Sequence, residues 1–284
     1  MNFLFIHGGP GLNSNPEKEI LSHEFSTNGD TLYFWNEPSR TRGSQLESVT
    51  FEDSCESLKL QILSLKDLGS LTVIAHSFGA FVFNQILPEI EQYIEKIVLI
   101  TPVFNLSYLD RNLIKRTALA YESIGDANSE VLKDYLGKFN PNQGFDEQRF
   151  NHILIAASYE KFNDAYWFQK DCMGAYYAHF NDLEYQFSMD NFKSIRSSCS
   201  VIESKNKTLI ETVIFYGKHD PFILSQESEL IKQIYPDSNI ITMESSSHYP
   251  HIEESREFLD TILRPNLILD LSHSERHEFI EKHL

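Results

Sequence analysis

Leu71–Phe81 reads LTVIAHSFGAF, and this stretch determines how the rest of the chain is interpreted. Its first five residues are apolar or β-branched, which predicts a short buried strand ending at Ala75. A helix is expected to begin at Phe78, so Ser77 lies in a very tight turn between the two elements. The small residues Ala75 and Gly79 stand two positions before and after this serine, as a nucleophile elbow requires. The alternative is an ordinary strand–helix loop that happens to contain a serine.

The same alternation of strands and helices runs through most of the chain. Short apolar runs predict strands at Asn2–Ile6, Thr31–Trp35, Leu71–Ala75, Lys96–Thr101, Thr212–Tyr216 and Asn239–Met243. The spacing of apolar residues predicts helices at Pro16–Phe25, Phe51–Leu68, Phe78–Tyr93, Gln226–Ile234 and Glu254–Leu263. Strands that alternate with helices form a parallel sheet covered on both faces, so the expected fold class is α/β.

The middle of the chain differs from the two outer parts. Residues 105–208 contain no clear β-run, are rich in aromatic residues, and carry nearly equal numbers of acidic and basic side chains. The outer parts carry the excess of acid. We therefore expect residues 1–104 and 209–284 to form one α/β core, and residues 105–208 to form a helical lid inserted into it.

A serine hydroxyl is a poor nucleophile until a base removes its proton, so an acid and a histidine should follow later strands. Asp220 stands in the motif GKHD just past the fifth predicted strand, although an ordinary Asp-Pro turn is the alternative. His248 follows the sixth predicted strand and precedes a helix. His251 competes with it, but His248 lies nearer the strand end. We therefore expect Ser77, Asp220 and His248 to be the catalytic residues.

Four motifs together resemble the α/β-hydrolase superfamily. They are HGGPG at 7–11, AHSFG at 75–79, GKHD at 217–220 and SSHYPHIEE at 246–254. The resemblance covers both outer parts of the chain and implies the fold of that superfamily. It also implies an oxyanion hole made by the backbone N–H groups of Gly9 and Phe78. Two such donors must converge where the tetrahedral oxyanion forms.

The position of the HGGPG turn bears on the size of the sheet. In the superfamily two further strands usually precede the strand that leads into this turn, whereas here that strand, Asn2–Ile6, follows Met1 directly. We therefore expect a sheet of about six strands, mainly parallel, that lacks the first two strands. Thr31–Trp35 would then be an edge strand, and edges of this kind are normally covered. A homodimer formed through Thr31–Trp35 is one way to cover it.

The expected function is that of a serine hydrolase that cleaves a small carboxylic ester, thioester or amide through an acyl-enzyme. The HGGPG turn is similar to that of proline iminopeptidases, so an aminopeptidase is the alternative. However, Phe34–Arg40 lacks the usual D-Q-R-G-type segment of that group, and the predicted lid has little excess acid to bind a free amine. AHSFG is closer to esterases and C–C bond hydrolases. A catalytically silent binding protein with this fold is a third possibility.

The predicted lid contains two adjacent pairs of aromatic residues. These are Trp167 with Phe168, and Tyr176 with Tyr177. One interpretation is that they fill the lid core and its contact with the main domain. The other is that they line an apolar substrate pocket above Ser77.

The composition limits the partners and the location. The net charge of -17 argues against nucleic acid, and no apolar run is long enough to span a membrane. Cys55, Cys172 and Cys199 are widely spaced and odd in number, which predicts free thiols and a cytoplasmic protein without a signal peptide. His273 and His277 share a predicted helix face but have no evident third ligand. We therefore expect a small-molecule substrate, no cofactor and no metal site.

Overall fold

The computed structural model describes residues 1–38, 40–42, 45–47, 49–179, 189–199, 207–222 and 225–264. The strands are β1 (Asn2–Ile6), β2 (Thr31–Trp35), β3 (Arg40–Arg42), β4 (Gln45–Glu47), β5 (Leu71–His76), β6 (Lys96–Ile100), β7 (Glu211–Gly217) and β8 (Asn239–Met243). The α-helices are α1 (Asn15–Thr27), α2 (Phe51–Leu65), α3 (Phe78–Ile90), α4 (Leu106–Ser123), α5 (Asn128–Gly137), α6 (Glu147–Ala157), α7 (Lys170–Ala178), α8 (Met189–Ser198), α9 (Ser225–Ile234), α10 (Pro250–Glu253) and α11 (Ser255–Leu263). Short 3₁₀-helices are η1 (Lys66–Leu68), η2 (Glu91–Tyr93) and η3 (Phe162–Tyr166).

The main sheet has six strands in the order β2-β1-β5-β6-β7-β8, and each neighbouring pair is parallel. In this register Ile6 of β1 lies opposite both Trp35 of β2 and Ala75 of β5. The segments that follow β1, β2 and β5 therefore emerge side by side at the carboxyl ends of these strands. The expected sheet of about six parallel strands, with Thr31–Trp35 at its edge, is confirmed.

A second, two-stranded sheet is formed by β3 and β4. These strands run antiparallel, with Arg40 opposite Glu47. No strands were predicted here, because three residues are too few for a period-two pattern to be recognised.

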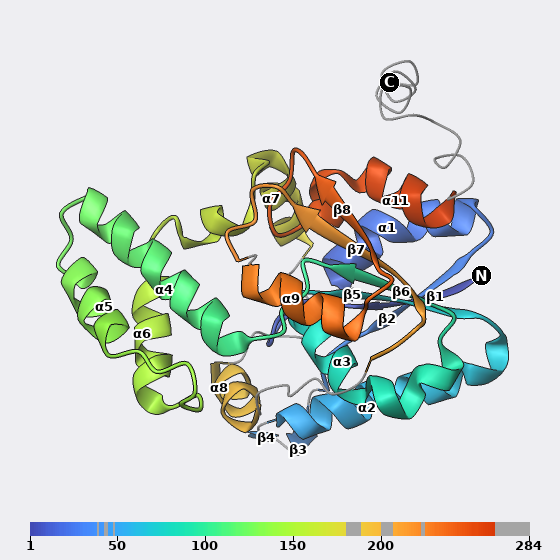
Figure 1. The fold of residues 1–284 in the computed structure, drawn as a ribbon, viewed down its shortest axis with the longest axis horizontal. Coiled ribbons are helices and arrows are strands. Elements are labelled where there is room, and N and C mark those ends of the chain that lie inside the picture. The colour runs from blue at the N-terminus through green and yellow to red at the C-terminus, as the bar shows by residue number, and fades with distance from the viewer. Residues whose placement is uncertain are drawn as a thin grey trace.

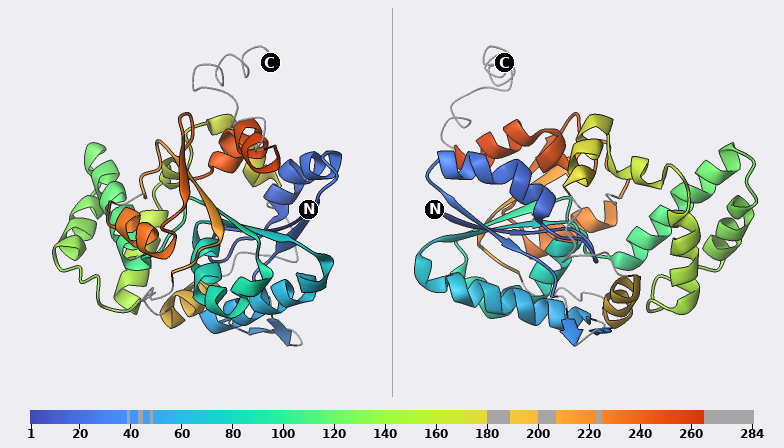
Figure 2. Two further views of the ribbon diagram at one scale, coloured as in Figure 1. Left: turned by 45° about the vertical axis from the view of Figure 1, so that its right-hand side comes forward. Right: turned by 180° about the vertical axis from the view of Figure 1, so that it is seen from behind.

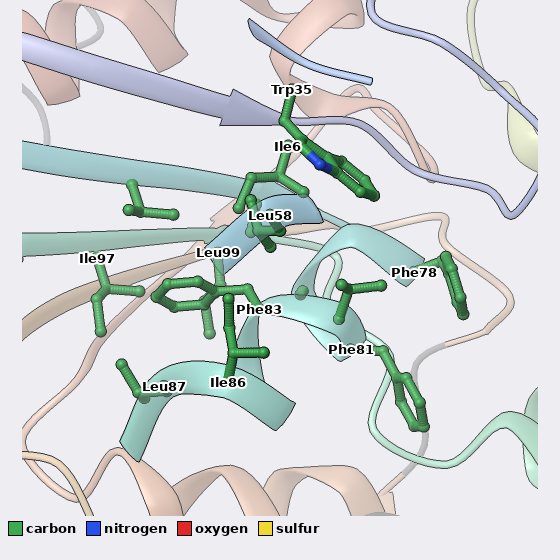
Figure 3. Close-up of a cluster of buried hydrophobic side chains, with 14 of the residues drawn as sticks. Ile6, Trp35, Leu58, Phe78, Phe81, Phe83, Ile86, Leu87, Ile97 and Leu99 are labelled. Carbon is green, nitrogen blue, oxygen red and sulfur yellow. The ribbon is translucent and has the colours of Figure 1, made fainter. Parts of the chain in front are cut away.

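The core lies on both faces of the main sheet, because successive side chains of a strand point to opposite faces. In β1, Leu4 and Ile6 pack into one cluster with α2, α3 and α9, whereas Phe3 and Phe5 pack into another with α1 and α11. Figures 1 and 2 show α1 and α11 covering one face, with α2 and α3 on the opposite face. Figure 3 shows the first cluster, in which Phe83 of α3 points toward the strands.

Between β6 and β7, the described residues form helices and no strands. Figure 1 shows α4, α5 and α6 standing beside the sheet, whereas α7 lies against α1 and α8 lies against α2. α4, α5 and α6 pack around a shared core, to which Phe222 also belongs and which includes Leu113, Ile114, Tyr121, Leu132, Tyr135 and Ile153. The segment is thus a helical unit beside the sheet. That it covers the active site as a lid stays a prediction.

The three cysteines form no disulfide. Among the described residues, no helix combines the length and apolar character needed to cross a membrane. The predicted C-terminal helix with His273 and His277 lies outside the described residues.

Candidate active site

Ser77 is the single residue between β5 and α3. Its φ of 50° and ψ of -116° are rare for a residue with a side chain, and such strain is typical of functional turns. Gly79 allows α3 to approach β1, because a Cβ there would lie 2.4 Å from the His7 carbonyl oxygen and 2.7 Å from that of Ile6. The strand–serine–helix turn expected from the sequence is therefore present, with the serine at the positive end of the α3 dipole.

His248 brings Ser77 and Asp220 together through both nitrogens of its ring. Its Nε2 lies 2.8 Å from Ser77 Oγ, and its Nδ1 lies 2.8 Å from Asp220 Oδ2. Because an ionised carboxylate only accepts hydrogen bonds, Nδ1 donates to Asp220, and Nε2 is left to accept from the serine hydroxyl. The second Asp220 oxygen accepts from the Phe222 N–H at 2.8 Å, which fixes the carboxylate. This arrangement can move a proton from Ser77 to His248.

Gly217, the last residue of β7, lets the loop that carries Asp220 pack against the loop that carries His248. A Cβ at Gly217 would lie 1.9 Å from the Ser247 carbonyl oxygen. Backbone hydrogen bonds then join the two loops, since the His219 N–H donates to the Ser246 carbonyl at 3.0 Å. The absence of a side chain at Gly217 therefore permits the spacing between acid and base.

Glu253 holds the His248 loop in place. Its Oε2 accepts from the Ser247 N–H at 2.7 Å, and its Oε1 accepts from the N–H groups of Phe168 and Gln169 at 2.6 and 2.7 Å. Burial raises the pKa of Glu253, while these three donors lower it. This carboxylate ties the histidine loop to the segment that leads into α7, a role that the sequence analysis did not identify.

The side chains of His76 and Thr101 form hydrogen bonds with the backbone at His248. The His248 carbonyl oxygen accepts from His76 Nε2 at 2.9 Å and from Thr101 Oγ1 at 3.0 Å. Burial lowers the pKa of His76 well below its ordinary value, so the ring is neutral at neutral pH.

Within the part of the chain that the structure describes, Glu17, His76 and His251 place ligand-type atoms within 4.8 Å of one another. No sequence pattern linked these three residues, and the predicted absence of a metal site stays a prediction.

The turn at residues 7–11 lies against the serine turn. A Cβ at Gly8 would lie 3.4 Å from Ser77 Cβ. Gly9 has a φ of 153°, which residues with side chains rarely adopt. Phe78 is the first residue of α3, so its N–H has no partner within the helix. Gly9 thus lies in the turn beside Ser77, and Phe78 directly follows it. Donation by their N–H groups to an oxyanion stays a prediction.

Glu37, which follows β2, supports this turn and was missed by the sequence analysis. Its Oε2 accepts from the Gly11 N–H at 2.8 Å, and its own N–H donates to His7 Nε2 at 3.2 Å. The other carboxyl oxygen is buried and has no hydrogen-bond partner among the described residues. Burial raises the pKa of Glu37 to about 8, although the hydrogen bond from the Gly11 N–H acts to lower this pKa. The segment that lacks the D-Q-R-G-type motif therefore still contacts the turn, through a carboxyl that is protonated at neutral pH.

Glu37→Gln is expected to remove a pH dependence of stability. The carboxyl titrates near 4.5 when exposed and at about 8 in the folded protein, so between these values the folded state binds more protons. The stability that Glu37 contributes is full below about pH 4.5 and is lost as the pH rises to about 8, by up to about 1.4 kcal/mol per pH unit. Urea unfolding of both proteins across this range measures the difference. Glu24→Gln, on the exposed side of α1, is the matched control; a Glu37→Gln profile as steep as that of the wild type would refute the expectation.

The four predicted pocket aromatics lie in or beside one cluster near the histidine loop. Trp167 and Tyr176 are buried, and Trp167 stacks on Tyr249 with ring centroids 4.2 Å apart. Tyr177 packs against the same cluster, and Phe168 is 48% exposed. Contact of any of these four with substrate stays a prediction.

The rings that lie against His248 include two that belong neither to its own loop nor to the β5 strand. Tyr166 and Phe222 have ring centroids 5.5 and 5.3 Å from the imidazole, and both meet it edge to face. The Tyr166 carbonyl oxygen also accepts from the His248 N–H at 3.0 Å. Phe222 lies two residues after Asp220, so its closeness to the acid in the sequence was the available signal. No local pattern distinguished Tyr166.

Comparison with known proteins agrees with this architecture. A proline iminopeptidase-related protein from Thermus thermophilus superimposes with a TM-score of 0.65 and 16% identity, over 92% of this chain and 87% of that one. An esterase from Exiguobacterium antarcticum gives 0.60 and 15%, over 93% and 90% of the two chains. An epoxide hydrolase from Bacillus megaterium gives 0.57 and 18%, over 92% and 91%. No curated protein matches the sequence.

At these identities the superpositions establish the fold alone. A family model described as alpha/beta hydrolase fold matches residues 2–255, which is most of the chain. Its span includes the turn at residues 7–11, the Ser77 turn and the Asp220 and His248 loops. The protein is therefore a member of the alpha/beta hydrolase fold family.

Proposed function

We propose that the protein is a serine hydrolase that cleaves a small carboxylic ester, thioester or amide through an acyl-enzyme intermediate. The observation that carries the proposal is the unbroken hydrogen-bonded chain from Ser77 through His248 to Asp220, with both distances at 2.8 Å. A nucleophile in contact with a base, and that base oriented by a carboxylate, is the general signature of nucleophilic catalysis. The strained backbone of Ser77 supports the same assignment.

In the proposed reaction, Ser77 Oγ attacks the acyl carbon while His248 Nε2 takes its proton. The imidazolium then gives this proton to the leaving oxygen, sulfur or nitrogen as the acyl–leaving group bond breaks. Water attacks the acyl-enzyme by the same route in reverse and releases the acid. Asp220 keeps the ring in the required tautomer throughout. The N–H groups of Gly9 and Phe78 stabilise the oxyanion, and loss of one such donor costs roughly 10²–10³ in rate.

Asp220→Asn is expected to lower kcat by roughly 10⁴, because an amide in place of the carboxylate favours the wrong tautomer of His248. The Phe222 N–H can still bond to the amide oxygen, so the fold should be retained. Steady-state hydrolysis of p-nitrophenyl butyrate measures the effect. Asp237→Asn, in the loop before β8, is a control for loss of one acid. Loss of less than about tenfold would show that Asp220 does not orient the base.

We also propose that α4–α8 act as a lid over this site. The lid segment supplies Tyr166, and residues that directly precede α7 bond to Glu253 on the histidine loop. A small-molecule substrate bound beneath it would meet the rings of Tyr166 and Phe222. Direct contacts from Trp167, Phe168, Tyr176 and Tyr177 belong to the same proposal.

The competing activity is that of an aminopeptidase with the same triad. Turnover of p-nitrophenyl butyrate compared with that of proline-naphthylamide separates the two, because only an aminopeptidase recognises the free amine. We expect the ester to be preferred, and a clear preference for the amide would replace the proposal with its alternative. If the protein turns over none of the esters, thioesters and amides tested, the result would favour a catalytically silent binding protein.

Homodimer formation through Thr31–Trp35, and a cytoplasmic location, remain predictions. β2 is the edge of the main sheet among the described strands, and its middle residues are partly exposed. Light scattering is expected to give the mass of a dimer, and Leu32→Lys is expected to convert it to the monomer. Leu60→Lys, at an exposed position of α2, is the matched control. A strict monomer in the wild type would exclude the dimer.

A further inference from the structure

Two buried arginines share one carboxylate beside the start of α4. Arg149 of α6 and Arg196 of α8 are each 3% exposed. Asp110 Oδ2 lies 2.5 Å from Arg196 Nη2 and 3.9 Å from Arg149 Nη1. The nearby Asp146 is already engaged by the Arg149 backbone N–H and by the Gln143 side chain. Among the described residues, the two guanidinium groups thus form ion pairs with a single carboxylate, that of Asp110, in a buried place where charges are normally paired.

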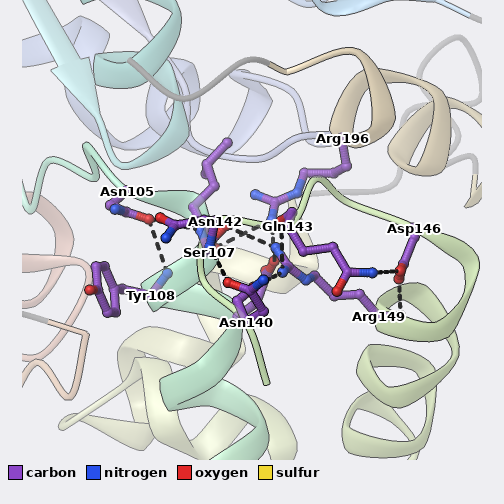
Figure 4. Close-up of polar contacts among 11 residues, drawn as sticks. Asn105, Ser107, Tyr108, Asn140, Asn142, Gln143, Asp146, Arg149 and Arg196 are labelled. Carbon is purple, nitrogen blue, oxygen red and sulfur yellow. Dashed lines mark hydrogen bonds and ion pairs between the residues drawn. The ribbon is translucent and has the colours of Figure 1, made fainter. Parts of the chain in front are cut away.

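Among the described residues, the donors of the two guanidinium groups are only partly used. Arg149 donates from Nη1 to Ser107 Oγ at 2.9 Å, and from Nη2 to the carbonyl oxygens of Asn140 and Gln143, both at 3.0 Å. Arg196 Nη2 donates to Asp110, and more weakly to the Leu106 carbonyl oxygen at 3.4 Å. The Nε atoms of both arginines are buried without a partner among the described residues. Figure 4 shows the two side chains converging beside Ser107.

A pocket of about 40 Å³ opens at this point. A water molecule needs roughly 10–15 Å³ on this measure, so the space suits a carboxylate-sized group. Its lining combines the two arginines with polar and aromatic side chains, including Asn105, Ser107, Phe81, Phe104 and Phe145. A small anionic head attached to an apolar chain fits such a lining.

This pocket lies close to the proposed catalytic site. Phe81, in its wall, stacks on Phe78 with ring centroids 5.9 Å apart, and Phe78 directly follows Ser77. On the other side, Tyr166 packs against His248. Burial raises the pKa of Tyr166, and among the charges that act on its hydroxyl are those of Asp110, which raises the pKa, and Arg196, which lowers it. The stacked rings of Phe78 and Phe81 thus connect the serine turn to the wall of the pocket.

We propose that this pocket binds a carboxylate at the far end of the substrate, so that the enzyme hydrolyses esters or thioesters that carry a free carboxylate away from the scissile bond. The proposal rests on the proposed serine hydrolase function. The two Nε–H groups that have no partner among the described residues can donate hydrogen bonds to a carboxylate, and the two guanidinium groups that share Asp110 can attract it. A free amine would be repelled, which also separates this enzyme from an aminopeptidase.

The activity test compares anionic with neutral substrates of the same length. Mono-p-nitrophenyl esters of succinic, glutaric and adipic acid are measured against the p-nitrophenyl esters of the corresponding monocarboxylic acids. We expect kcat/KM to favour the anionic ester by at least about tenfold at one chain length. The overall charge of -17 would otherwise disfavour anions. A preference for the neutral ester at every length would overturn the proposal.

Variants connect the preference to the arginines. Arg196→Met alone removes the nearer of the two arginine partners of the buried Asp110, so the double variant Arg196→Met/Asp110→Asn is tested beside it. Each folded variant is expected to lower the anionic-to-neutral ratio of kcat/KM by at least about tenfold. Arg116→Met, on the exposed side of α4, removes the same charge from the same segment and should leave the ratio unchanged. Equal ratios in all of these proteins would contradict the proposal.

Binding to an inactive protein separates this proposal from the catalytic one. Titration calorimetry of Ser77→Ala with monomethyl glutarate and with methyl pentanoate measures recognition without turnover. We expect binding of the acid, weakened by at least about tenfold in the Arg196→Met/Asp110→Asn background, and weaker binding of the neutral ester. Binding without esterase activity in the wild type would refute the serine hydrolase function alone. Neutral-ester turnover without binding of the acid would refute the carboxylate pocket alone.

Discussion

Ser77→Ala is expected to lower kcat for ester hydrolysis by roughly 10⁵–10⁶, because the protein then lacks the atom that forms the acyl-enzyme. The residual rate over water would come from binding and the oxyanion donors. The φ of 50° at this position strains alanine about as much as serine, so the melting temperature should stay close to that of the wild type. Steady-state kinetics with p-nitrophenyl butyrate provide the measurement, together with a thermal melt of both proteins.

The kinetic test becomes sharper with two further variants. His248→Ala should cost about as much as Ser77→Ala, and the double variant should cost little more than either, because the residues act as one unit. Ser245→Ala, an exposed serine in the same histidine loop, is the matched control and should retain activity. Near-normal turnover by Ser77→Ala, or independent losses that multiply in the double variant, would show that the two residues do not act together.

Gly217→Ala is expected to destabilise the protein by about 3 kcal/mol, near the upper end of what overpacking costs. The added Cβ would lie 1.9 Å from the Ser247 carbonyl oxygen, and a further carbonyl oxygen, that of Ser246, would lie 2.7 Å away. Both atoms are backbone, so neither can turn aside as a flexible side chain would. The melting temperature should fall by roughly 6–12 °C. Activity should fall as well, since the clash pushes the His248 loop away from Asp220.

A second glycine provides the control for Gly217. Gly174 lies within the exposed part of α7, and a Cβ there would meet nothing within 4 Å. Gly174→Ala should raise stability by roughly 0.5–1 kcal/mol, because glycine loses more backbone entropy than alanine in a helix. Thermal or urea unfolding compares the two substitutions. Equal effects would mean that the two loops do not constrain Gly217.

The sheet and the three central site residues were predictable because they depend on short local signals. The predicted strands Asn2–Ile6, Thr31–Trp35 and Asn239–Met243 match the structure. The carboxyl ends of parallel strands lie at the same end of a sheet, so a serine and a histidine that follow different strands can meet there. Ser77 and His248 are 171 residues apart in sequence, yet their order after successive strands was enough to pair them.

The supporting residues were not predictable, because their roles depend on packing between distant segments. Glu37 resembles an ordinary surface acid in the sequence, and only the approach of Gly11, 26 residues earlier, gives it a function in the turn. Arg149 and Arg196 belong to a segment of balanced charge, where basic residues are usually solvated. Their burial beside Asp110 follows from how α4, α6 and α8 pack, and no pattern within one helix encodes that.

The proposed reaction requires Ser77 to form a covalent intermediate with help from His248 and Asp220. Labelling with a fluorophosphonate probe, followed by intact-mass and peptide mass spectrometry, tests it most directly, since such probes react with an activated serine. We expect a single adduct on Ser77, much slower labelling of Asp220→Asn, and no adduct on Ser77→Ala. An unlabelled wild-type protein, an adduct on another residue, or equal labelling of Ser77→Ala would contradict it.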